Sequence, residues 1–270
     1  MIKLSIIVPA YNAGPFLRRC LESLWLNKIT GPSYLDKVEF IVLNDASTDD
    51  TGKVLDDFSY KTAFTIVNHS TNWGVAMSRN HGLALARGEW ITFLDADDEL
   101  TPNAIEIMLA KIDNPKYNDR PIIQFNHMRQ KGNEAPVIRQ SNRAGNYYAQ
   151  AMPLRWFYVW NKIYNRQFLK ANGIRFRENM DYGEDAIFVL ECLRANRWIY
   201  HANEITVIKH FDNPDSLTKT LTPKRINDFI RAELDLLEQE GNPEEFNALV
   251  RELIEDQMRS GPFIRIYGKL

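Results

Sequence analysis

Acidic side chains follow two short apolar runs of the chain, at the points where those runs end. Asp45 comes shortly after the run at residues 38–43, and Asp95 and Asp97 come directly after the run at residues 90–94. A carboxylate placed beside a buried strand is costly unless it is paired, hydrogen-bonded or coordinated. Two acids separated by one small residue can turn toward one hard cation, which can bridge them to phosphate oxygens. This pattern suggests a cation and a phosphorylated ligand.

The same acids have a purely structural alternative. Asp95, Asp97 and Asp98 could form a turn and cap a helix, with Thr101 as its N-cap and Pro102 in its first position. An Asp-x-Asp pair alone is a weak signal. The elements and motifs around it must decide between the two interpretations.

The first hundred residues alternate apolar runs with helical patterns, an order typical of a parallel sheet with crossover helices. The predicted strands lie at residues 4–8, 38–43, 64–67 and 90–94, and the predicted helices at residues 15–26, 54–58 and 72–86. In an open parallel sheet, ligands bind at the carboxyl ends of strands, where the strand order reverses. We therefore expect the acids to lie at a ligand-binding edge.

The pattern is looser after residue 112. It predicts strands at residues 122–125 and 205–211, an irregular or hairpin segment at 132–145, and helices at 165–171 and 184–195. From residue 222, two amphipathic helices form a hairpin, and a basic, apolar tail follows at residues 259–270. The hairpin could pack on the rest of the chain, pair with a second subunit or rest on a membrane.

The composition excludes several classes of protein. The chain has 270 residues and a formal net charge of −2, with 44% hydrophobic and 25% charged residues, which are ordinary globular values. No apolar run approaches the ~20 residues of a spanning helix, and the weak net charge argues against a nucleic-acid partner. Cys20 and Cys192 give neither a disulfide framework nor zinc-ligand spacing. A cytoplasmic protein, or one peripheral to a membrane, is expected.

A series of short motifs resembles those of the glycosyltransferase family 2 enzymes. The motifs are Val8-Pro9-Ala10-Tyr11-Asn12, Val42-Leu43-Asn44-Asp45-Ala46-Ser47-Thr48-Asp49, Asn72-Trp73-Gly74-Val75-Ala76-Met77-Ser78-Arg79-Asn80, Gly88 to Asp98, Trp160-Asn161-Lys162 and Gly183-Glu184-Asp185. They cover residues 4 to about 211 in order and at family-like spacing, which is more specific than any single motif. The sequence departs at Asn44 and Ala46, because Asp-Asp-Gly is commoner there. Asn44 must replace a carboxylate by hydrogen bonding, and Ala46 lacks the backbone freedom of glycine.

The resemblance implies an α/β protein with the GT-A (Rossmann-like) fold. This fold has a mixed, mostly parallel sheet flanked by helices, and here the C-terminal helical hairpin follows it. Residues 1–221 would form the catalytic domain, with a nucleotide-binding half at 1–112 and an acceptor-side half at 113–221. Residues 222–270 would carry the amphipathic helices and the basic tail.

The resemblance also implies a nucleotide-sugar site. Its residues would be Pro9, Tyr11, Asn12, Asn44, Asp45, Asn72, Gly74, Arg79, Asp95 and Ala96. Tyr11 would stack on the nucleobase, Asp45 would accept from a uracil or a ribose, and Asp95 would accept from ribose hydroxyls. Arg79 would hold the nucleotide-side carboxylates. The structural alternatives are a half-buried loop tyrosine at Tyr11 and a solvated surface arginine at Arg79.

Two further groups of residues follow from the same resemblance. Asp97 and His210 would bind Mn²⁺ or Mg²⁺, although a lone histidine at a strand end could equally be structural. Trp160 and Lys162 would contact the diphosphate or the acceptor. Lys162 could instead be a surface lysine whose charged head reaches water.

Inverting sugar transfer needs a base that removes the proton of the acceptor hydroxyl. Asp185 is the predicted base, and Glu184 is either the alternative base or an acceptor-binding residue. Asp185 could instead cap the helix at residues 184–195, because the positive end of the helix dipole favours a carboxylate. A capping bond would favour the ionised form and lower its basicity.

The sequence thus predicts an inverting, metal-dependent glycosyltransferase. It would move a sugar from a nucleotide-sugar, with UDP as the expected nucleotide, to a hydroxyl of a glycan or lipid-linked saccharide in bacterial-type surface polysaccharide synthesis. The alternatives are a sugar-nucleotide pyrophosphorylase or nucleotidyltransferase and a non-catalytic nucleotide-sugar-binding protein. The hairpin could form a homo-oligomer, and the tail could contact the inner face of the membrane.

Overall fold

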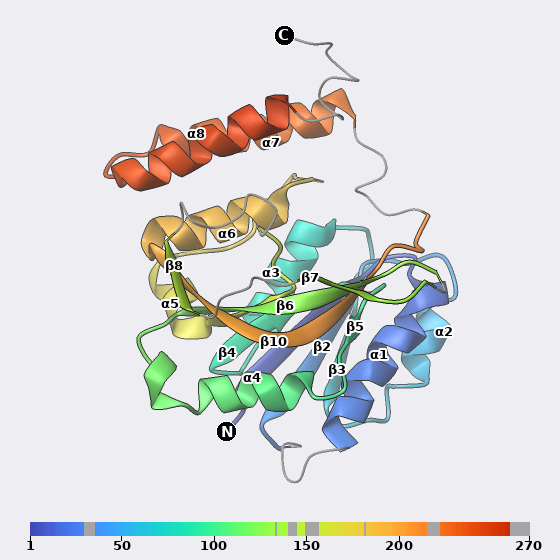
Figure 1. Cartoon of the computed structure of the whole chain (residues 1–270). Helices are drawn as coiled ribbons and strands as arrows, with labels where there is room; N and C mark the ends of the chain where they lie inside the picture. Colours follow the sequence, from blue (N-terminus) through green and yellow to red (C-terminus); the bar gives the residue numbers. More distant parts are fainter. Residues whose placement is uncertain are drawn as a thin grey trace.

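One mixed β-sheet forms the centre of the protein (Figure 1). The computed structural model describes residues 1–29, 36–132, 134–139, 145–148, 157–180, 182–214 and 222–259. In pairing order the sheet runs through β3 (Phe64–Asn68), β2 (Val38–Asn44), β1 (Leu4–Ala10), β4 (Trp90–Phe93), β9 (Lys162–Asn165), β6 (Ile122–Gln130), β10 (Trp198–His210) and β5 (Glu99–Leu100). Two further strands lie outside this order: β7 (Val137–Arg139) pairs with β6, and β8 (Gly145–Tyr148) pairs with β10.

The strand order reverses at β1. This strand pairs in parallel with β2 on one side and with β4 on the other, and β3 extends the parallel set beyond β2. β9 runs antiparallel to β4 and β6, whereas β10 runs parallel to β6. The carboxyl ends of β1 and β4 therefore flank a topological switch point, which is where open α/β sheets bind ligands.

Helices cover both faces of the sheet. Successive side chains of β1 point to opposite faces, and apolar side chains on each face are buried under helices. Leu4, Ile6 and Val8 share a buried cluster with residues of α1 (Gly14–Ile29), α2 (Thr51–Asp56) and α4 (Ala104–Ile112). Ile7 packs on the other face with α3 (Val75–Leu85) and α6 (Glu184–Ala195). The short α5 (Arg166–Ala171) follows β9, and a 3-10 turn (Pro115–Tyr117) follows α4.

Most predicted elements are confirmed. The strands expected at residues 4–8, 38–43, 64–67 and 90–94 are β1 to β4, and the helices expected at 15–26, 165–171 and 184–195 are α1, α5 and α6. The predicted cap at Thr101 is wrong, because α4 begins at Ala104 with Asn103 as its N-cap. The Thr101 hydroxyl instead donates to the carbonyl of Ile205 in β10 at 2.8 Å. β5 and β9 were not among the predicted strands.

The C-terminal hairpin packs on the core, which was one of its three expected roles. Its helices are α7 (Pro223–Leu237) and α8 (Glu244–Met258), and in Figure 1 they lie beyond α6, away from the sheet. The hairpin side chains that join the buried cluster around α6 are Phe229, Ala232, Leu236, Phe246, Leu249, Val250 and Leu253. Within the described part of the chain, no helix is both long and apolar enough to cross a membrane. Residues 260–270 of the basic tail lie outside the described residues.

Helix α7 touches the turn that begins α6. Gly183 is the N-cap of α6 and has a φ of 77°. A Cβ atom added to Gly183 would lie 2.6 Å from the ring of Phe229 in α7. Only glycine combines this backbone conformation with so close an approach. Helix α7 of the hairpin therefore packs directly against the turn that positions the next two residues, Glu184 and Asp185.

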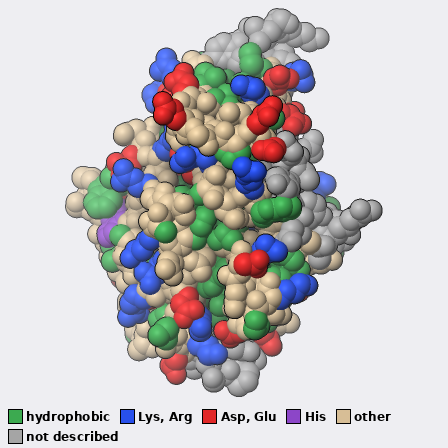
Figure 2. Space-filling view, turned by 90° about the vertical axis from the view of Figure 1, so that its left-hand side faces the viewer, with side chains coloured by type: hydrophobic (Ala, Val, Ile, Leu, Met, Phe, Trp, Pro, Cys, Tyr) green, Lys and Arg blue, Asp and Glu red, His purple; other side chains and the backbone are tan. Residues whose placement is uncertain are grey.

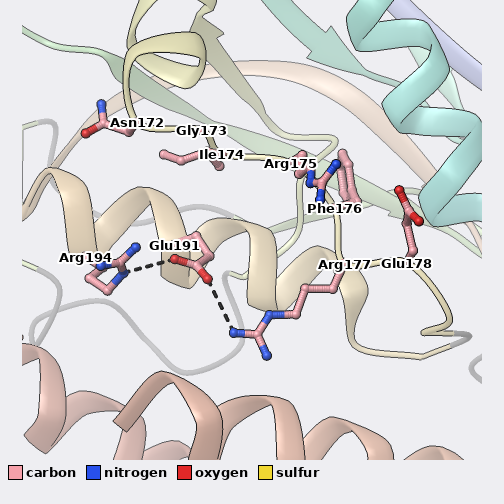
Figure 3. A pocket seen from close by; sticks show the side chains of 9 residues that line it. All are labelled: Asn172, Gly173, Ile174, Arg175, Phe176, Arg177, Glu178, Glu191 and Arg194. Atoms are coloured by element: carbon pink, nitrogen blue, oxygen red, sulfur yellow. Dashed lines mark hydrogen bonds and ion pairs between the residues drawn. The ribbon is translucent and has the colours of Figure 1, made fainter. Parts of the chain in front are cut away.

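A cavity of about 360 Å³ lies where the core meets the hairpin (Figure 3). Glu191 in α6 accepts from Arg194 at 3.0 Å and from Arg177 at 3.4 Å. Arg177 also donates to the Ala232 carbonyl in α7 at 3.2 Å, so these bonds tie the hairpin to the core. None of the predicted site residues lines this cavity. Figure 2 views the molecule from the side at which α7 and α8 are joined, and the part of the hairpin that it shows carries interspersed acidic and basic side chains.

Candidate active site

Three carboxylates surround one lysine at the edge of the sheet. The Nζ atom of Lys209 lies 3.1 Å from Asp95 Oδ2, 3.7 Å from Asp97 Oδ1 and 2.9 Å from Asp98 Oδ2. The acids lie in the loop between β4 and β5, and β5 pairs antiparallel with β10, which carries Lys209. This strand pairing explains how a lysine 111 residues away from Asp98 reaches it.

Further hydrogen bonds fix the acidic loop. The fully buried Asp98 accepts from the backbone N–H of His210 at 2.9 Å. Asp97 accepts from Arg19 of α1 at its carbonyl oxygen, at 2.8 Å, and from Asn213 at its Oδ2, at 2.9 Å. The turn proposed as the structural alternative exists, because the N–H of Asp98 donates to the Asp95 carbonyl at 3.0 Å. The expected helix cap does not accompany it.

The charges of this group depend on each other. Burial raises the pKa of Asp98 to about 8, although the ammonium of Lys209 opposes the shift. Burial alone would lower the pKa of Lys209, but the carboxylates of Asp98, Asp95 and Asp97 raise it above its usual value. Lys209 is therefore a cation over the whole physiological range of pH.

The three carboxylates fit a divalent cation. One oxygen each from Asp95, Asp97 and Asp98 lies within 4.8 Å of the others. Carboxylate oxygens are the ligands that Mg²⁺ and Mn²⁺ prefer. His210 was the other expected ligand, but its Nε2 lies 2.7 Å from Glu99 Oε1 and it is not part of the three-carboxylate group. Asp98 is therefore a further candidate ligand, and metal binding by His210 stays a prediction.

Arg79 joins the acidic loop to α6. It is buried on α3, where one nitrogen donates to Asp95 Oδ1 at 3.0 Å and another to Glu184 Oε1 at 2.6 Å. The guanidinium also lies over the ring of Phe176, 5.3 Å from its centre. The alternative of a solvated surface arginine is therefore wrong. Arg79 places the first acid of the Asp-x-Asp pair and the start of α6 on either side of one cation.

Asp185 follows Glu184 in the first turn of α6. Its Oδ1 accepts from the backbone N–H of Ala186 at 2.8 Å, so it does contact the positive end of the helix, as the capping alternative expects. Burial, together with the charge of Glu184, nevertheless raises the pKa of Asp185 to about 7, while Arg79 opposes the shift. Burial therefore outweighs the capping bond, and the carboxyl has the proton affinity of a base that works near neutral pH.

The loops after β1 and β2 are bonded to each other. The Asn12 side chain accepts from the backbone N–H of Thr48 at 2.8 Å, and the Asn12 N–H donates to the Ser47 hydroxyl at 3.0 Å. Asn44 accepts from the Ser47 N–H at 3.2 Å and donates to Asn68 at 2.9 Å, so its amide takes over a structural hydrogen-bonding role. Tyr11 is 52% exposed at this edge, which leaves its ring open to a ligand.

Ala46 occupies a conformation that favours glycine, with a φ of 58°. The Ala46→Gly variant should raise the free energy of unfolding by about 0.5–1 kcal/mol, because it removes the strain of a Cβ atom in the left-handed region. The matched control is Ala110→Gly at an exposed position inside α4, which should lower it by about 1 kcal/mol. Denaturant titration measures both, and a destabilised Ala46→Gly protein would contradict the expectation.

Asp45 is buried and holds the segment before α3. Its carboxylate accepts from the backbone N–H groups of Trp73 and Gly74, each at 2.8 Å, and from His69 Nδ1 at 2.8 Å. The Asn72 side chain also accepts from the Gly74 N–H, at 3.0 Å. The structure thus brings the predicted residues Asp45, Asn72 and Gly74 together. His69, which belongs to none of the sequence motifs, stacks on Trp73 with ring centres 3.9 Å apart.

The sequence has known relatives. The family model described as glycosyl transferase family 2 matches residues 5–179. The chain belongs to this family. The uncharacterized glycosyltransferase EpsJ of Bacillus subtilis is 28% identical over 225 residues, which are 80% of this chain and 62% of EpsJ. The poly(ribitol-phosphate) beta-N-acetylglucosaminyltransferase TarS of Staphylococcus aureus is 28% identical over 201 residues, 73% of this chain and 34% of TarS.

Solved structures share the fold of this family 2 protein. TarS in complex with UDP-GlcNAc superimposes with a TM-score of 0.77 at 20% identity, over 98% of this chain and 73% of that one. The mannosyltransferase PcManGT of Pyrobaculum calidifontis, in complex with GDP-Man and Mn²⁺, gives 0.66 at 15% identity, over 96% and 70%. The predicted GT-A fold is confirmed. The chain spans less than two thirds of the length of EpsJ and about a third of TarS.

The acceptor-side residues of the family 2 motif lie deeper than expected. Lys162 is fully buried in β9, where its Nζ donates to the Tyr158 carbonyl at 2.6 Å and to Asn161 Oδ1 at 2.9 Å. The surface-lysine alternative is therefore wrong. Burial lowers its pKa to about 7, with Asp185 opposing. Trp160 is also buried and stacks on Tyr158 with ring centres 4.9 Å apart. Contact of Trp160 and Lys162 with a diphosphate or an acceptor stays a prediction.

Proposed function

We propose that this family 2 protein is a cytoplasmic, inverting glycosyltransferase. It moves a sugar from a UDP-sugar to a hydroxyl of a glycan or lipid-linked saccharide in the synthesis of a surface polysaccharide. The observation that carries the proposal is Arg79, which links Asp95 in the loop after β4 to Glu184 at the start of α6. The shared fold with TarS bound to UDP-GlcNAc, and the teichoic acid enzymes among the relatives, support the choice of donor and product.

The chemistry on the acceptor side falls to Asp185. Its neighbour Glu184 is committed to the ion pair with Arg79, whose guanidinium donates to its Oε1 at 2.6 Å. Asp185 has the raised pKa that proton abstraction needs, so it takes the proton of the acceptor hydroxyl as that oxygen attacks the sugar. Attack from the face opposite the leaving nucleoside diphosphate inverts the anomeric centre, and no covalent intermediate is needed.

The chemistry on the donor side needs positive charge near the diphosphate. Asp95, Asp97 and Asp98 would hold a divalent cation, which when bound offsets the negative charge that develops on the leaving group. Tyr11 would stack on the base at the exposed end of β1, and Asp45 would position the loop around Gly74 from within. Arg79 orients Asp95 toward the ribose.

Donor binding tests the proposal without knowledge of the acceptor. A UDP-sugar at about a hundred times its Kd, with Mn²⁺, should raise the Tm of the protein by roughly 5–10 °C. The Asp97→Ala variant should lose most of the Mn²⁺-dependent part of this shift, because one of three candidate ligands is gone. Asp119→Ala, at an exposed acid outside the site, is the control and should behave as the natural protein does. If no nucleotide-sugar changes the Tm at any metal concentration, the proposal fails.

A further inference from the structure

Lys209 lies where a divalent cation would have to bind. Its Nζ is within 3.7 Å of one oxygen from each of Asp95, Asp97 and Asp98. Those three acids are also the described residues that could jointly hold a metal ion. An ammonium and a metal ion cannot both lie at the point where three carboxylates meet, because both need the same oxygens and repel each other.

The other oxygen of each carboxylate bonds elsewhere. Asp95 Oδ1 accepts from Arg79, Asp97 Oδ2 from Asn213 and Asp98 Oδ1 from the backbone N–H of His210. The oxygens directed at Lys209 are therefore the ones that a metal ion would use. Rotating a carboxylate to present its second oxygen would break a bond of 2.9–3.0 Å in a largely buried loop. A metal ion can therefore bind to these oxygens only when the side chain of Lys209 has moved away from them.

We propose that Lys209 is an internal counter-cation that competes with the divalent metal for the carboxylates of Asp95, Asp97 and Asp98. Without a ligand the ammonium offsets part of the negative charge of the acidic loop, and the metal binds only in the minority of molecules in which Lys209 has left. A departing ammonium needs a new anionic partner, which the diphosphate of the donor can supply. Metal and nucleotide should therefore bind cooperatively. The inference rests on the proposed function only in treating the three acids as the metal site.

The apparent affinity for a metal falls by the fraction of molecules in which the site is open. If Lys209 leaves the acids in about 1–10% of molecules, removal of its charge should tighten metal binding about 10- to 100-fold. The experiment titrates the full chain with Mn²⁺, without nucleotide, and follows free Mn²⁺ by electron paramagnetic resonance. It compares the natural protein with Lys209→Met, which keeps the length of the side chain and removes its charge.

Two control variants separate competition from general charge effects. Lys209→Arg keeps a cation at the site and should bind Mn²⁺ as weakly as the natural protein does. Lys111→Met removes an equal charge from a lysine that pairs with Glu204, away from the acidic loop, and should also leave the affinity unchanged. The proposal is overturned if Lys209→Met binds Mn²⁺ no more tightly than the natural protein, or if neither protein binds it. Sugar transfer is not measured, so this result stands apart from the test of the proposed function.

Lys209→Met could fail to fold, because it leaves three acids without their cation. A second measurement then uses the natural protein. Amine acetylation followed by mass spectrometry should find Lys209 protected in the metal-free protein. Lys209 should react several times faster when Mg²⁺ fills the site, at a Mg²⁺ concentration chosen because it displaces bound Mn²⁺. Lys111 should react equally in both conditions. A Lys209 that stays protected when the metal site is filled would overturn the proposal.

Discussion

The Asp185→Asn variant should transfer sugar about 10²- to 10⁴-fold more slowly than the natural protein, the range expected when a general base is lost. Asparagine has nearly the same shape, and its side-chain oxygen can still accept the Ala186 N–H that Asp185 accepts at 2.8 Å. An amide cannot take a proton from a hydroxyl, so kcat should fall while the affinity for UDP is retained. Initial rates of UDP release with saturating donor and acceptor, together with UDP binding, measure the two effects.

Glu184→Gln is the informative companion variant, because it changes the neighbouring acid in the same way. Glu184 accepts from Arg79 at 2.6 Å, so its loss should weaken the fold and donor binding rather than remove the base. If Asp185→Asn keeps the full rate and Glu184→Gln loses it at unchanged stability, Glu184 is the base. That result would remove Asp185 from the mechanism.

The raised pKa of Asp185, about 7, gives the same assignment a dependence on pH. The carboxyl is protonated below its pKa and cannot act as a base, so kcat/KM should fall about tenfold per unit of pH below about pH 7 and level off above it. The residual activity of Asp185→Asn should lack this decrease in kcat/KM at low pH. A profile of the natural protein that is flat from about pH 5 to 8 would contradict the assignment.

The first half of the fold could be predicted because its strands carry a strong local signal. β2 is buried along its whole length, and its residues Phe40 to Leu43 form a continuous apolar run. β5 has two residues, and β9 includes the buried Lys162 and ends at Asn165, so neither shows a recognisable pattern. The predicted strand at residues 205–211 is only the second half of β10, because the first half includes the polar residues His201, Asn203 and Glu204. Tertiary contacts, which a local pattern cannot report, make these segments strands.

The candidate site, like the fold, could be predicted from the sequence only in part. The acids after β4 could be found because they follow an apolar run and belong to an ordered series of motifs. Which of Asp97 and Asp98 is buried could not be found, since neighbouring acids look alike in sequence, and the pairing of β5 with β10 decides it. Lys209 had no signal of its own, because one lysine near a strand end is ordinary. Its place in the candidate site depends on its contacts with acids that lie more than a hundred residues earlier in the chain.

Removal of Arg79 should have the largest effect on stability of any single change at the site. Arg79→Met leaves the carboxylates of Asp95 and Glu184 largely buried without their shared cation, and breaking a buried ion pair in this way costs about 3–5 kcal/mol. Tm should fall by roughly 6–20 °C, and donor binding should weaken because Asp95 is no longer oriented. Differential scanning calorimetry and UDP binding measure the two effects.

The control is Arg18→Met, which removes an exposed arginine from its ion pair with Asp57 and should change Tm little. Arg79→Lys gives a sharper test, since an ammonium keeps the charge but lacks the planar fork that reaches Asp95 and Glu184 together. It should recover part of the stability and less of the activity. If Arg79→Met retains the Tm of the natural protein, the link between the acidic loop and α6 is not structural. The contact that carries the proposed function would then lose its support.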